Sequence, residues 1–526
     1  YVEEGNKRVS VLKYFKADSI VANVTRKIPK YSEDEDVKLY YEYMKFNQIS
    51  GLNNIEFSKI GMVDKLLALM GSTAIWDADT RMEFNSLVNH FTKAYEFRGG
   101  RKLPIRVGDA LTAFINVYGY NTVLGMSDDE LSLNIVKCWN EFVMLTEKQS
   151  VGLVMDPLAA EERKGRNIFS YFMPSSAKKF TVAFLYPKSP DTSDWIYAHD
   201  LGRNYLEETF PDQMKTICVN DVTEERTEQV LNDVIRQGAD IIFEVAPQMM
   251  KDSLKVAVDH PDVKILNCSL NTSHKYIRTY YARMYEAKFL SGMIAGALAE
   301  NDRIAYIADY PIYGMIANIN AFALGASFTN PRARIYLAWS TSENYDRERF
   351  LKDNNIQVVS DQDMITPRDP GRQFGLYECS EDGRKLNLVM PLWNWGVFYE
   401  KMIQSILAGS YQSEENSEGR ALNYWWGMSA GVIDLICSKN VPTGVKRLVD
   451  HLKSDIKKGD IVPFYGEIRA QDGTLKNKKD KAMKPEAIME MDWLTDNVIG
   501  EIPTMGELRA EARPVVQIKG VEEKMK

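Results

Sequence analysis

Short apolar runs alternate with amphipathic stretches along the middle of the chain. Four such runs occupy residues 180–186, 216–219, 240–245 and 263–269, and stretches with helical periodicity near 195–210, 224–237 and 248–259 separate them. Continuous apolar strands separated by helices are typical of a parallel sheet that is covered on both faces. The sequence therefore predicts an open α/β unit that begins near residue 178.

The same alternation repeats further along the chain. Apolar runs recur at 303–308, 334–339, 356–360 and 386–391, with helical patterns near 314–328 and 342–352. Two repeats predict two α/β lobes with a ligand cleft between them. We expect lobe 1 at about 178–300 and lobe 2 at about 301–395. A helix near 397–407 and the segments after 440 are expected to return and complete the lobes, and 466–474 to form a hairpin.

The first part of the chain has a different pattern. Between residues 34 and 151 apolar side chains recur at three- and four-residue spacing, and the predicted helices cover 37–49, 60–70, 81–97, 110–118 and 131–145. Ser127 and Glu130 form a capping box before the last of them. The segment 156–176 mixes proline, charge and serine, which is typical of a linker. We expect a mainly α-helical module over 1–173, and place the boundary near Pro174.

Composition excludes several classes of function. The chain has 526 residues, a formal net charge of -8 and only scattered cysteines, five in number, without C-x-x-C spacing. Clustered positive charge is needed to neutralise phosphates, so no nucleic-acid partner is expected. No metal site, disulfide framework or transmembrane span is expected either. The visible chain slightly favours a cytoplasmic location, while an extracytoplasmic, membrane-associated protein is expected if an upstream signal was removed before Tyr1.

The segment FTVAFLYPKSPDTSDWIYAHDLG, residues 180–202, predicts a strand, a ligand loop and a helix. It carries neither of the glycine signatures that wrap a dinucleotide or a nucleoside triphosphate, so those cofactors are not expected. Loops that follow strands converge at one edge of such a sheet. The polar and aromatic residues in those positions are Ser189, Asp191, Trp195, Pro247, Gln248, Ser269, Asn271, Tyr310, Tyr313, Ser340, Asp361, Asp363, Trp393, Asn394 and Trp395. Rings, amides and carboxylates suit a small planar polar molecule.

Several segments carry a family resemblance. SDWIYAHDLGRNYLEE, YYARMYEAKFLSGMIAGALA, YPIYGMIANINAFALGA, WNWGVFYEKMIQSILAG and the closing MDWLTDNVIGEIP resemble, in order and spacing, the basic membrane protein (BMP) family, over about residues 178–503. The resemblance implies a two-lobed fold of the periplasmic-binding-protein type (type I) with doubly wound parallel sheets. It also implies non-enzymatic binding of a purine nucleobase or nucleoside, and an ABC transporter permease as a partner.

The resemblance also suggests individual roles. Trp195 stands at the position of the family's first base-stacking aromatic, and Asp191 at the acidic position before it. Ile196 replaces an asparagine that often reads the base edge, so Tyr197 or His199 would supply polarity. After Trp393 and Asn394 the family's ribose-contacting lysine is missing, which favours an adenine-like base over a nucleoside.

The complete set of candidate ligand residues combines the positions after predicted strands with those that the family resemblance suggests. It comprises Asp191, Trp195, Tyr197, His199, Gln248, Asn271, Tyr313, Asp363, Trp393 and Asn394. For Trp195, His199 and Trp393 the alternative is ordinary packing, and for Asp363 a solvated loop position. The sequence offers no catalytic triad, cofactor motif or metal cluster, and no catalytic residue is expected.

The start of the chain suggests a further anion site. Gly5, Asn6, Lys7 and Arg8 resemble the E-G-x-x-R turn of ParB and sulfiredoxin-like domains, where a helix N-terminus meets phosphate. The alternative is that Lys7 and Arg8 are ordinary surface charges. An intracellular module of this kind gives a second functional hypothesis, a ligand-responsive regulator in which the N-terminal module reads out occupancy of the cleft.

Overall fold

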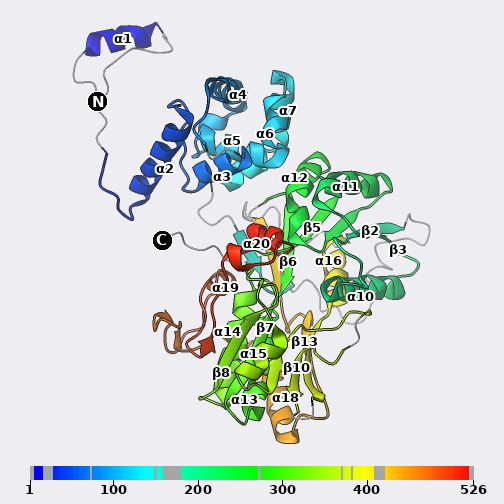
Figure 1. The fold of residues 1–526 in the computed structure, drawn as a ribbon. Coiled ribbons are helices and arrows are strands. Elements are labelled where there is room, and N and C mark those ends of the chain that lie inside the picture. The colour runs from blue at the N-terminus through cyan, green and yellow to red at the C-terminus, as the bar shows by residue number, and fades with distance from the viewer. Residues whose placement is uncertain are drawn as a thin grey trace.

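The structure is a computed structural model of the chain. It describes residues 5–15, 28–71, 74–146, 151–157, 179–270, 274–368, 371–380, 383–407, 411 and 421–520. Figure 1 shows a helical N-terminal part that lies on one of two α/β lobes, with the short helix α1 apart from both. In the described residues, no helix combines the length and the apolar character that crossing a membrane requires.

Lobe 1 is built on a sheet in which every pair of neighbouring strands is parallel. Its strand order is β1-β12-β6-β5-β4-β2-β3. The strands are β1 (Val151–Val154), β2 (Phe180–Leu185), β3 (Met214–Val219), β4 (Ile241–Glu244), β5 (Lys264–Cys268), β6 (Ile277–Ala282) and β12 (Ala421–Trp426). Successive side chains of β2 point to opposite faces. Val182 and Phe184 join one apolar core, and Ala183 and Leu185 join the other.

Helices cover both faces of this sheet. The helices on one face are α10 (Asp194–Thr209) and α16 (Trp395–Leu407), and those on the other are α11 (Thr227–Arg236) and α12 (Met250–Asp259). The sheet therefore has the covered, doubly wound form that its apolar strands predict.

Lobe 2 has a mixed sheet with the order β13-β11-β10-β9-β7-β8-β16. The strands are β7 (Arg303–Ala308), β8 (Arg334–Trp339), β9 (Val358–Ser360), β10 (Leu376–Cys379), β11 (Lys385–Trp393), β13 (Ile433–Cys437) and β16 (Val498–Ile499). Strands β16, β8, β7 and β9 are parallel, while β10, β11 and β13 pair antiparallel. Its helices are α13 (Tyr285–Leu298), α14 (Met315–Thr329), α15 (Arg347–Asp353) and α18 (Thr443–Lys458).

Helices α13 and α14 pack with their backbones in direct contact. A methyl group on Gly325 would lie 1.9 Å from the Phe289 carbonyl oxygen, and one on Gly292 would lie 2.0 Å from that of Phe322. Because any larger side chain would separate the helices, these glycines bring α13 onto lobe 2. The change of lobe therefore falls before Tyr285, and the prediction that lobe 1 runs to about residue 300 is corrected.

The predicted two-lobed α/β fold is confirmed, with two further differences. Strand β1 lies within the residues predicted for the N-terminal module, yet it pairs with β12, so the α/β unit includes Val151–Val154. Lobe 2 also differs from a purely parallel sheet, because β10, β11 and β13 pair antiparallel. The predicted boundary at Pro174 and most of the polar linker lie outside the described residues.

The chain passes between the lobes after β6, after β11 and between β12 and β13. These crossing segments are hydrogen-bonded to one another. The Asn394 backbone N–H donates to the Val432 carbonyl (2.8 Å), and the Asn394 side-chain amide donates to the Gly431 carbonyl (3.1 Å). Glu286 accepts a hydrogen bond from the Met428 N–H (2.6 Å) and pairs with Arg283 (2.6 Å). These bonds form the hinge between the lobes.

The N-terminal module is helical, as predicted. Its helices are α2 (Glu35–Ser50), α3 (Met62–Leu69), α4 (Ala78–Phe97), α5 (Val107–Tyr118), α6 (Tyr120–Leu124), α7 (Asp128–Lys137) and α8 (Trp139–Met144), with a 3-10 turn η1 (Gly100–Lys102). The predicted helix over 131–145 is two helices that meet at Cys138, and the capping box of Ser127 and Glu130 is present. The apolar core of the module continues into that of α11 and α12, so the module is docked on lobe 1.

Helix α1 (Asn6–Tyr14) buries none of its residues. Gly5 caps it with φ of 91°, a left-handed conformation that glycine adopts without strain. Asn6, Lys7 and Arg8 are exposed in its first turn. The binding of phosphate by this turn stays a prediction.

The C-terminal segment returns along lobe 2. It contains the predicted hairpin, β14 (Ile468–Arg469) and β15 (Leu475–Asn477), followed by α19 (Pro485–Met489). The Asn320 side chain of α14 holds this segment by donating to the Trp493 carbonyl (2.8 Å) and accepting from the Thr495 N–H (2.9 Å). The chain then forms the turn η4 (Met505–Glu507) and the helix α20 (Arg513–Lys519).

Candidate functional site

A cavity of about 460 Å³ lies between the lobes, at the carboxyl ends of their parallel strands. Lobe 1 contributes the loop and first turn between β2 and α10, the 3-10 turn η3 (Pro247–Met249) after β4, and the end of β5. Lobe 2 contributes the residues that follow β7, β8 and β9. This is the position in which open α/β sheets bind ligands.

Aromatic rings form one part of the wall. Trp195 lies in the first turn of α10, with its ring centroid 5.8 Å from that of Tyr281 on β6 and 5.2 Å from that of Trp393 at the end of β11. The Trp195 indole N–H donates to the Val245 carbonyl (2.8 Å), which fixes the orientation of the ring. All three side chains line the cavity and offer faces on which a planar molecule can stack.

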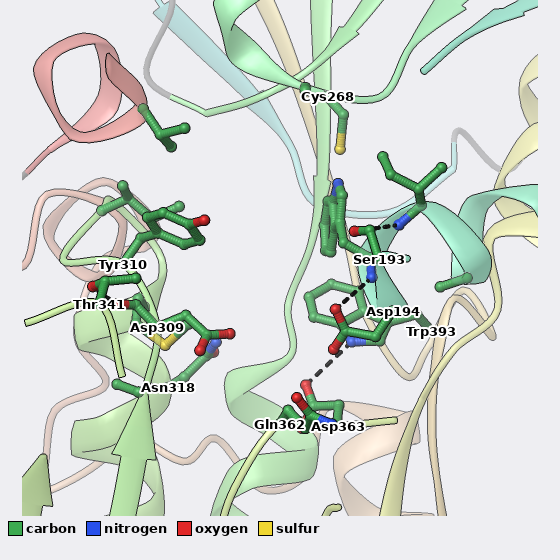
Figure 2. Close-up of a pocket in the computed structure, with 18 of the residues that line it drawn as sticks. Ser193, Asp194, Cys268, Asp309, Tyr310, Asn318, Thr341, Gln362, Asp363 and Trp393 are labelled. Carbon is green, nitrogen blue, oxygen red and sulfur yellow. Dashed lines mark hydrogen bonds between the residues drawn. The ribbon is translucent and has the colours of Figure 1, made fainter. Parts of the chain in front are cut away.

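Two carboxylates lie on opposite walls. Figure 2 shows Asp194 beside Ser193 and Trp393 on one side, and Asp309 with Tyr310 and Thr341 on the other. An Asp194 oxygen accepts from the Trp195 backbone N–H (2.8 Å), and an Asp309 oxygen accepts from the Ser340 hydroxyl (2.5 Å). Within the described part of the chain, neither carboxylate forms an ion pair with a basic side chain.

Burial and mutual repulsion act on these two groups. Burial, and then the charge of Asp309, raise the pKa of Asp194 from 3.8 to about 6. Burial also raises the pKa of Asp309, against the opposing effect of the Ser340 hydrogen bond. Holding both groups ionised in the empty cavity therefore costs free energy, and a ligand that donates hydrogen bonds to both would recover it.

A third carboxylate is already neutralised. Asp363 pairs with Lys288 of α13 (2.5 Å) and accepts a hydrogen bond from the Trp393 indole N–H (3.2 Å). Burial lowers the pKa of Lys288, but Asp363 outweighs it and the net shift is upward, so this lysine stays protonated. The pair orients Trp393 and joins α13 to the end of β9. In the same way, Asp361 is paired with Arg347.

The structure brings five of the predicted ligand residues to the cavity. Trp195, Gln248, Tyr313, Asp363 and Trp393 line it. Asp191 is exposed on the same loop and does not line the cavity, and neither does Tyr197. Asn271 lies outside the described residues.

Two other predicted residues have different roles. Asn394 binds the carbonyl of Gly431 in the hinge, as described above, rather than the cavity. His199 is fully buried, with its ring 4.3 Å from that of Trp395 and its Nδ1 2.5 Å from the Tyr399 hydroxyl. Burial lowers the pKa of His199 well below 6.5, so it is a neutral core residue. Its position on the inner face of α10, one turn after Trp195, turns it toward α16.

Several cavity residues were not predicted as ligand residues. Asp309 directly follows β7 and Asp194 directly precedes Trp195, so the rule that polar residues after strands line the cleft would have found both. Lys288 and Asn318 lie within helices, and only the tertiary packing of α13 and α14 brings them to the cavity. In the described residues, no group of three or more His, Cys, Asp and Glu side chains is placed to hold a metal ion.

The raised pKa of Asp194 predicts a pH-dependent cost to stability. A carboxyl with a folded-state pKa of about 6 and an ordinary value of 3.8 stabilises the protein below about pH 4, and this stabilisation is lost as the pH rises through 6. The Asp194→Asn variant has no ionisable carboxyl at this position, so it does not lose stability in this way as the pH rises. We expect the variant to be more stable than the wild type at pH 7.5, by on the order of 1 kcal/mol, and the difference to vanish near pH 4.

Thermal unfolding of the ligand-free proteins across this pH range tests the prediction. Asp191→Asn, on the exposed part of the same loop, is the matched control and should leave the midpoint unchanged at each pH. A destabilised Asp194→Asn variant at pH 7.5, or a difference that does not depend on pH, would contradict it.

Comparison with known proteins adds to this geometry. The family described as "Bmp: ABC transporter substrate-binding protein PnrA-like" matches residues 179–367. A purine-binding protein of Brucella abortus is 27% identical over 339 residues, which cover 62% of this chain and 95% of the relative. A putative ABC transporter glucose-binding protein of Haloferax volcanii is 24% identical over 344 residues, covering 63% of this chain and 83% of the relative.

Among solved structures, an ABC transporter solute-binding protein from Conexibacter woesei covers 54% of this chain and 98% of its own length, with 15% identity and a TM-score of 0.40. The match over 179–367 and the relatives that align across more than 330 residues agree with the two lobes and the cleft between them. Residues 179–367 thus match the model of the Bmp family of ABC transporter substrate-binding proteins, and the two-lobed α/β unit that contains them is similar to members of that family.

Proposed function

We propose that the protein binds a purine nucleobase or nucleoside, adenine-like in its hydrogen-bonding edge, in the cleft between the lobes. The observation that carries the proposal is the combination of the Trp195 ring with the facing carboxylates of Asp194 and Asp309. An aromatic face suits a heterocycle, and carboxylate oxygens accept hydrogen bonds from ring N–H and exocyclic amino groups. The similarity to a purine-binding protein supports the same ligand class.

Ligand binding is proposed to close the cleft. Trp195 and Asp194 belong to lobe 1, whereas Asp309 belongs to lobe 2, so a ligand contacts both only when the lobes approach. The ligand then stabilises the closed form by the free energy of the contacts that the open form lacks. In this role the protein binds its ligand without converting it and delivers it to the permease of an ABC transporter.

A thermal-shift screen tests the ligand class. Purine bases and nucleosides, sugars including glucose, and amino acids are added to the full chain, since a ligand that binds only the folded state raises its stability by about 2.7 kcal/mol at a concentration of 100 Kd. We expect the largest shift from adenine or a purine nucleoside. If glucose or another sugar shifts the midpoint and purines do not, the proposed ligand is wrong.

Variants of Trp195 provide the control for this screen. Trp195→Ala should weaken purine binding by on the order of 1 to 3 kcal/mol, because base stacking on an aromatic ring is lost. Trp195→Phe retains an aromatic face and should retain most of the affinity. Equal affinities of the wild type and Trp195→Ala would show that this ring only packs.

A second candidate function is favoured by the way the N-terminal module holds a loop of the cavity. Ser269 and Leu270 line the cavity at the end of β5, and the chain reaches the module a few residues later. There Glu141 of α8 accepts a hydrogen bond from the Lys275 backbone N–H (2.6 Å), with His274 Nδ1 at 3.2 Å. The module is thus attached to a segment that begins at the ligand site.

Buried hydrogen bonds join the same part of the cavity to α12. The Ser269 hydroxyl donates to the Asn267 side-chain oxygen (2.8 Å), and the Asn267 amide donates to Glu244 (2.8 Å). Glu244 in turn accepts from Ser253 of α12, the helix on which α5 of the module packs. We therefore keep the proposal of an intracellular regulator in which the module reads out occupancy of the cleft.

Hydrogen exchange distinguishes this regulator from a binding protein whose module is passive. Linkage requires that a ligand coupled to the module change the stability of its docking. We expect adenine to slow backbone exchange in α5 and α8, and Glu141→Gln to reduce this effect while leaving adenine affinity within a few fold. Exchange over residues 107–144 that is the same with and without adenine would contradict the regulator.

A further inference from the structure

We propose that the C-terminal helix α20 is part of the ligand site, where it forms a wall of the cavity at Val515 and a clasp that holds the two lobes together. This inference rests on the proposed function for the identity of the ligand, and on the geometry of the C-terminal segment for everything else. Val515 lines the cavity although every other lining residue lies between Pro187 and Trp393. The chain therefore returns to the cleft after both lobes are complete.

The segment that carries α20 is anchored on lobe 2. The Arg509 N–H donates to the Thr341 carbonyl (2.9 Å), and the Glu343 N–H donates to the Glu507 carbonyl (3.0 Å). At the other end of the helix, Gly520 forms an antiparallel bridge with Ile312. These contacts fall on the loops that follow β7 and β8, which also supply Asp309, Ser340 and Thr341 to the cavity.

Apolar contacts fix the helix in the same place. Leu508, Ala512 and Val516 form a small buried cluster, and Tyr310 and Ile312 pack against it. Tyr310 and Ile312 also line the cavity, so α20 supports the wall of lobe 2 from behind. A side chain that disrupts this cluster should therefore release α20 from lobe 2.

The helix also reaches lobe 1, where α20 packs against η3. Pro247 and Gln248 of that turn line the cavity. In Figure 1 the red helix α20 lies where the two lobes meet, and in Figure 2 its ribbon lies above Tyr310 at the edge of the cavity. One segment thus contacts both lobes at the rim of the ligand site.

This arrangement has a consequence for ligand exchange. When the lobes separate, a helix anchored on lobe 2 has to lose its contact with η3, so that contact exists only in the closed form. It adds to the free energy of closure and slows ligand release. In the closed form it should also limit access to the cavity wall in lobe 1, where Cys268 lies with 2% of its surface exposed.

Two variants of the full chain test the clasp. Val516→Asp introduces a charge into the buried cluster and should detach α20, while Gln517→Asp places the same charge on the exposed face of the helix. We expect Val516→Asp to raise the dissociation rate of adenine on the order of tenfold and to speed maleimide labelling of Cys268 in the ligand-free protein several-fold. Labelling is followed on the Cys268 peptide by mass spectrometry, and Gln517→Asp should behave as the wild type.

Val515→Ala is the third variant. It shortens the side chain that lines the cavity and leaves the buried cluster of Leu508, Ala512 and Val516 unchanged. It should raise the dissociation rate of adenine a few fold. If Val516→Asp does not fold, this variant alone tests whether α20 is part of the ligand site. A folded Val516→Asp protein with wild-type labelling of Cys268, or a Val515→Ala protein with the wild-type dissociation rate, would overturn the proposal. Faster labelling of Cys268 in a protein that binds no purine would uphold the clasp and refute the proposed ligand instead.

Discussion

The stacking of His199 on Trp395, with 4.3 Å between the ring centroids, joins the two helices on which the ligand site depends. Helix α10 follows β2 of lobe 1, and α16 begins where the chain returns from lobe 2. Their close approach requires the absence of side chains at Gly202 and Gly396, where a methyl group would lie 2.9 and 2.6 Å from atoms of the neighbouring helix. Trp195 lies one turn before His199, and Trp393 lies two residues before Trp395. The buried contact therefore sets the positions of both indoles in the cavity.

Some of the carboxylates that line the cavity are paired with a basic side chain, and others are not. Lys288 and the Trp393 indole satisfy Asp363, and Arg347 satisfies Asp361. Asp194 and Asp309 have no basic partner within the described residues, and burial together with their mutual repulsion raises the pKa of Asp194. A binding site that holds unneutralised acceptors on both lobes is less stable when empty than when it is filled by a hydrogen-bond donor. The same cost therefore favours closure around the ligand and disfavours closure without it.

Much of the fold follows from the sequence because apolar strands and amphipathic helices have distinct periods. Several strands went unpredicted because they lack a continuous apolar run or are short: β6, for example, contains arginine, threonine and tyrosines, and β1 is a short edge strand. Trp195 and Trp393 could be placed in the cleft because they follow strands. His199 and Asn394 were misplaced because a polar residue near a site can instead face a helix neighbour or a hinge. The contributions of Lys288 and Val515 depend on tertiary packing over long sequence separations, which no local pattern reveals.

The most direct test of the account is a crystal structure of the full chain with adenine. We expect closed lobes with the purine ring stacked on Trp195, and ring or amino N–H groups directed to Asp194 and Asp309. Adenine bound outside the cleft, or bound within it without contact to Trp195 and either carboxylate, would contradict the account.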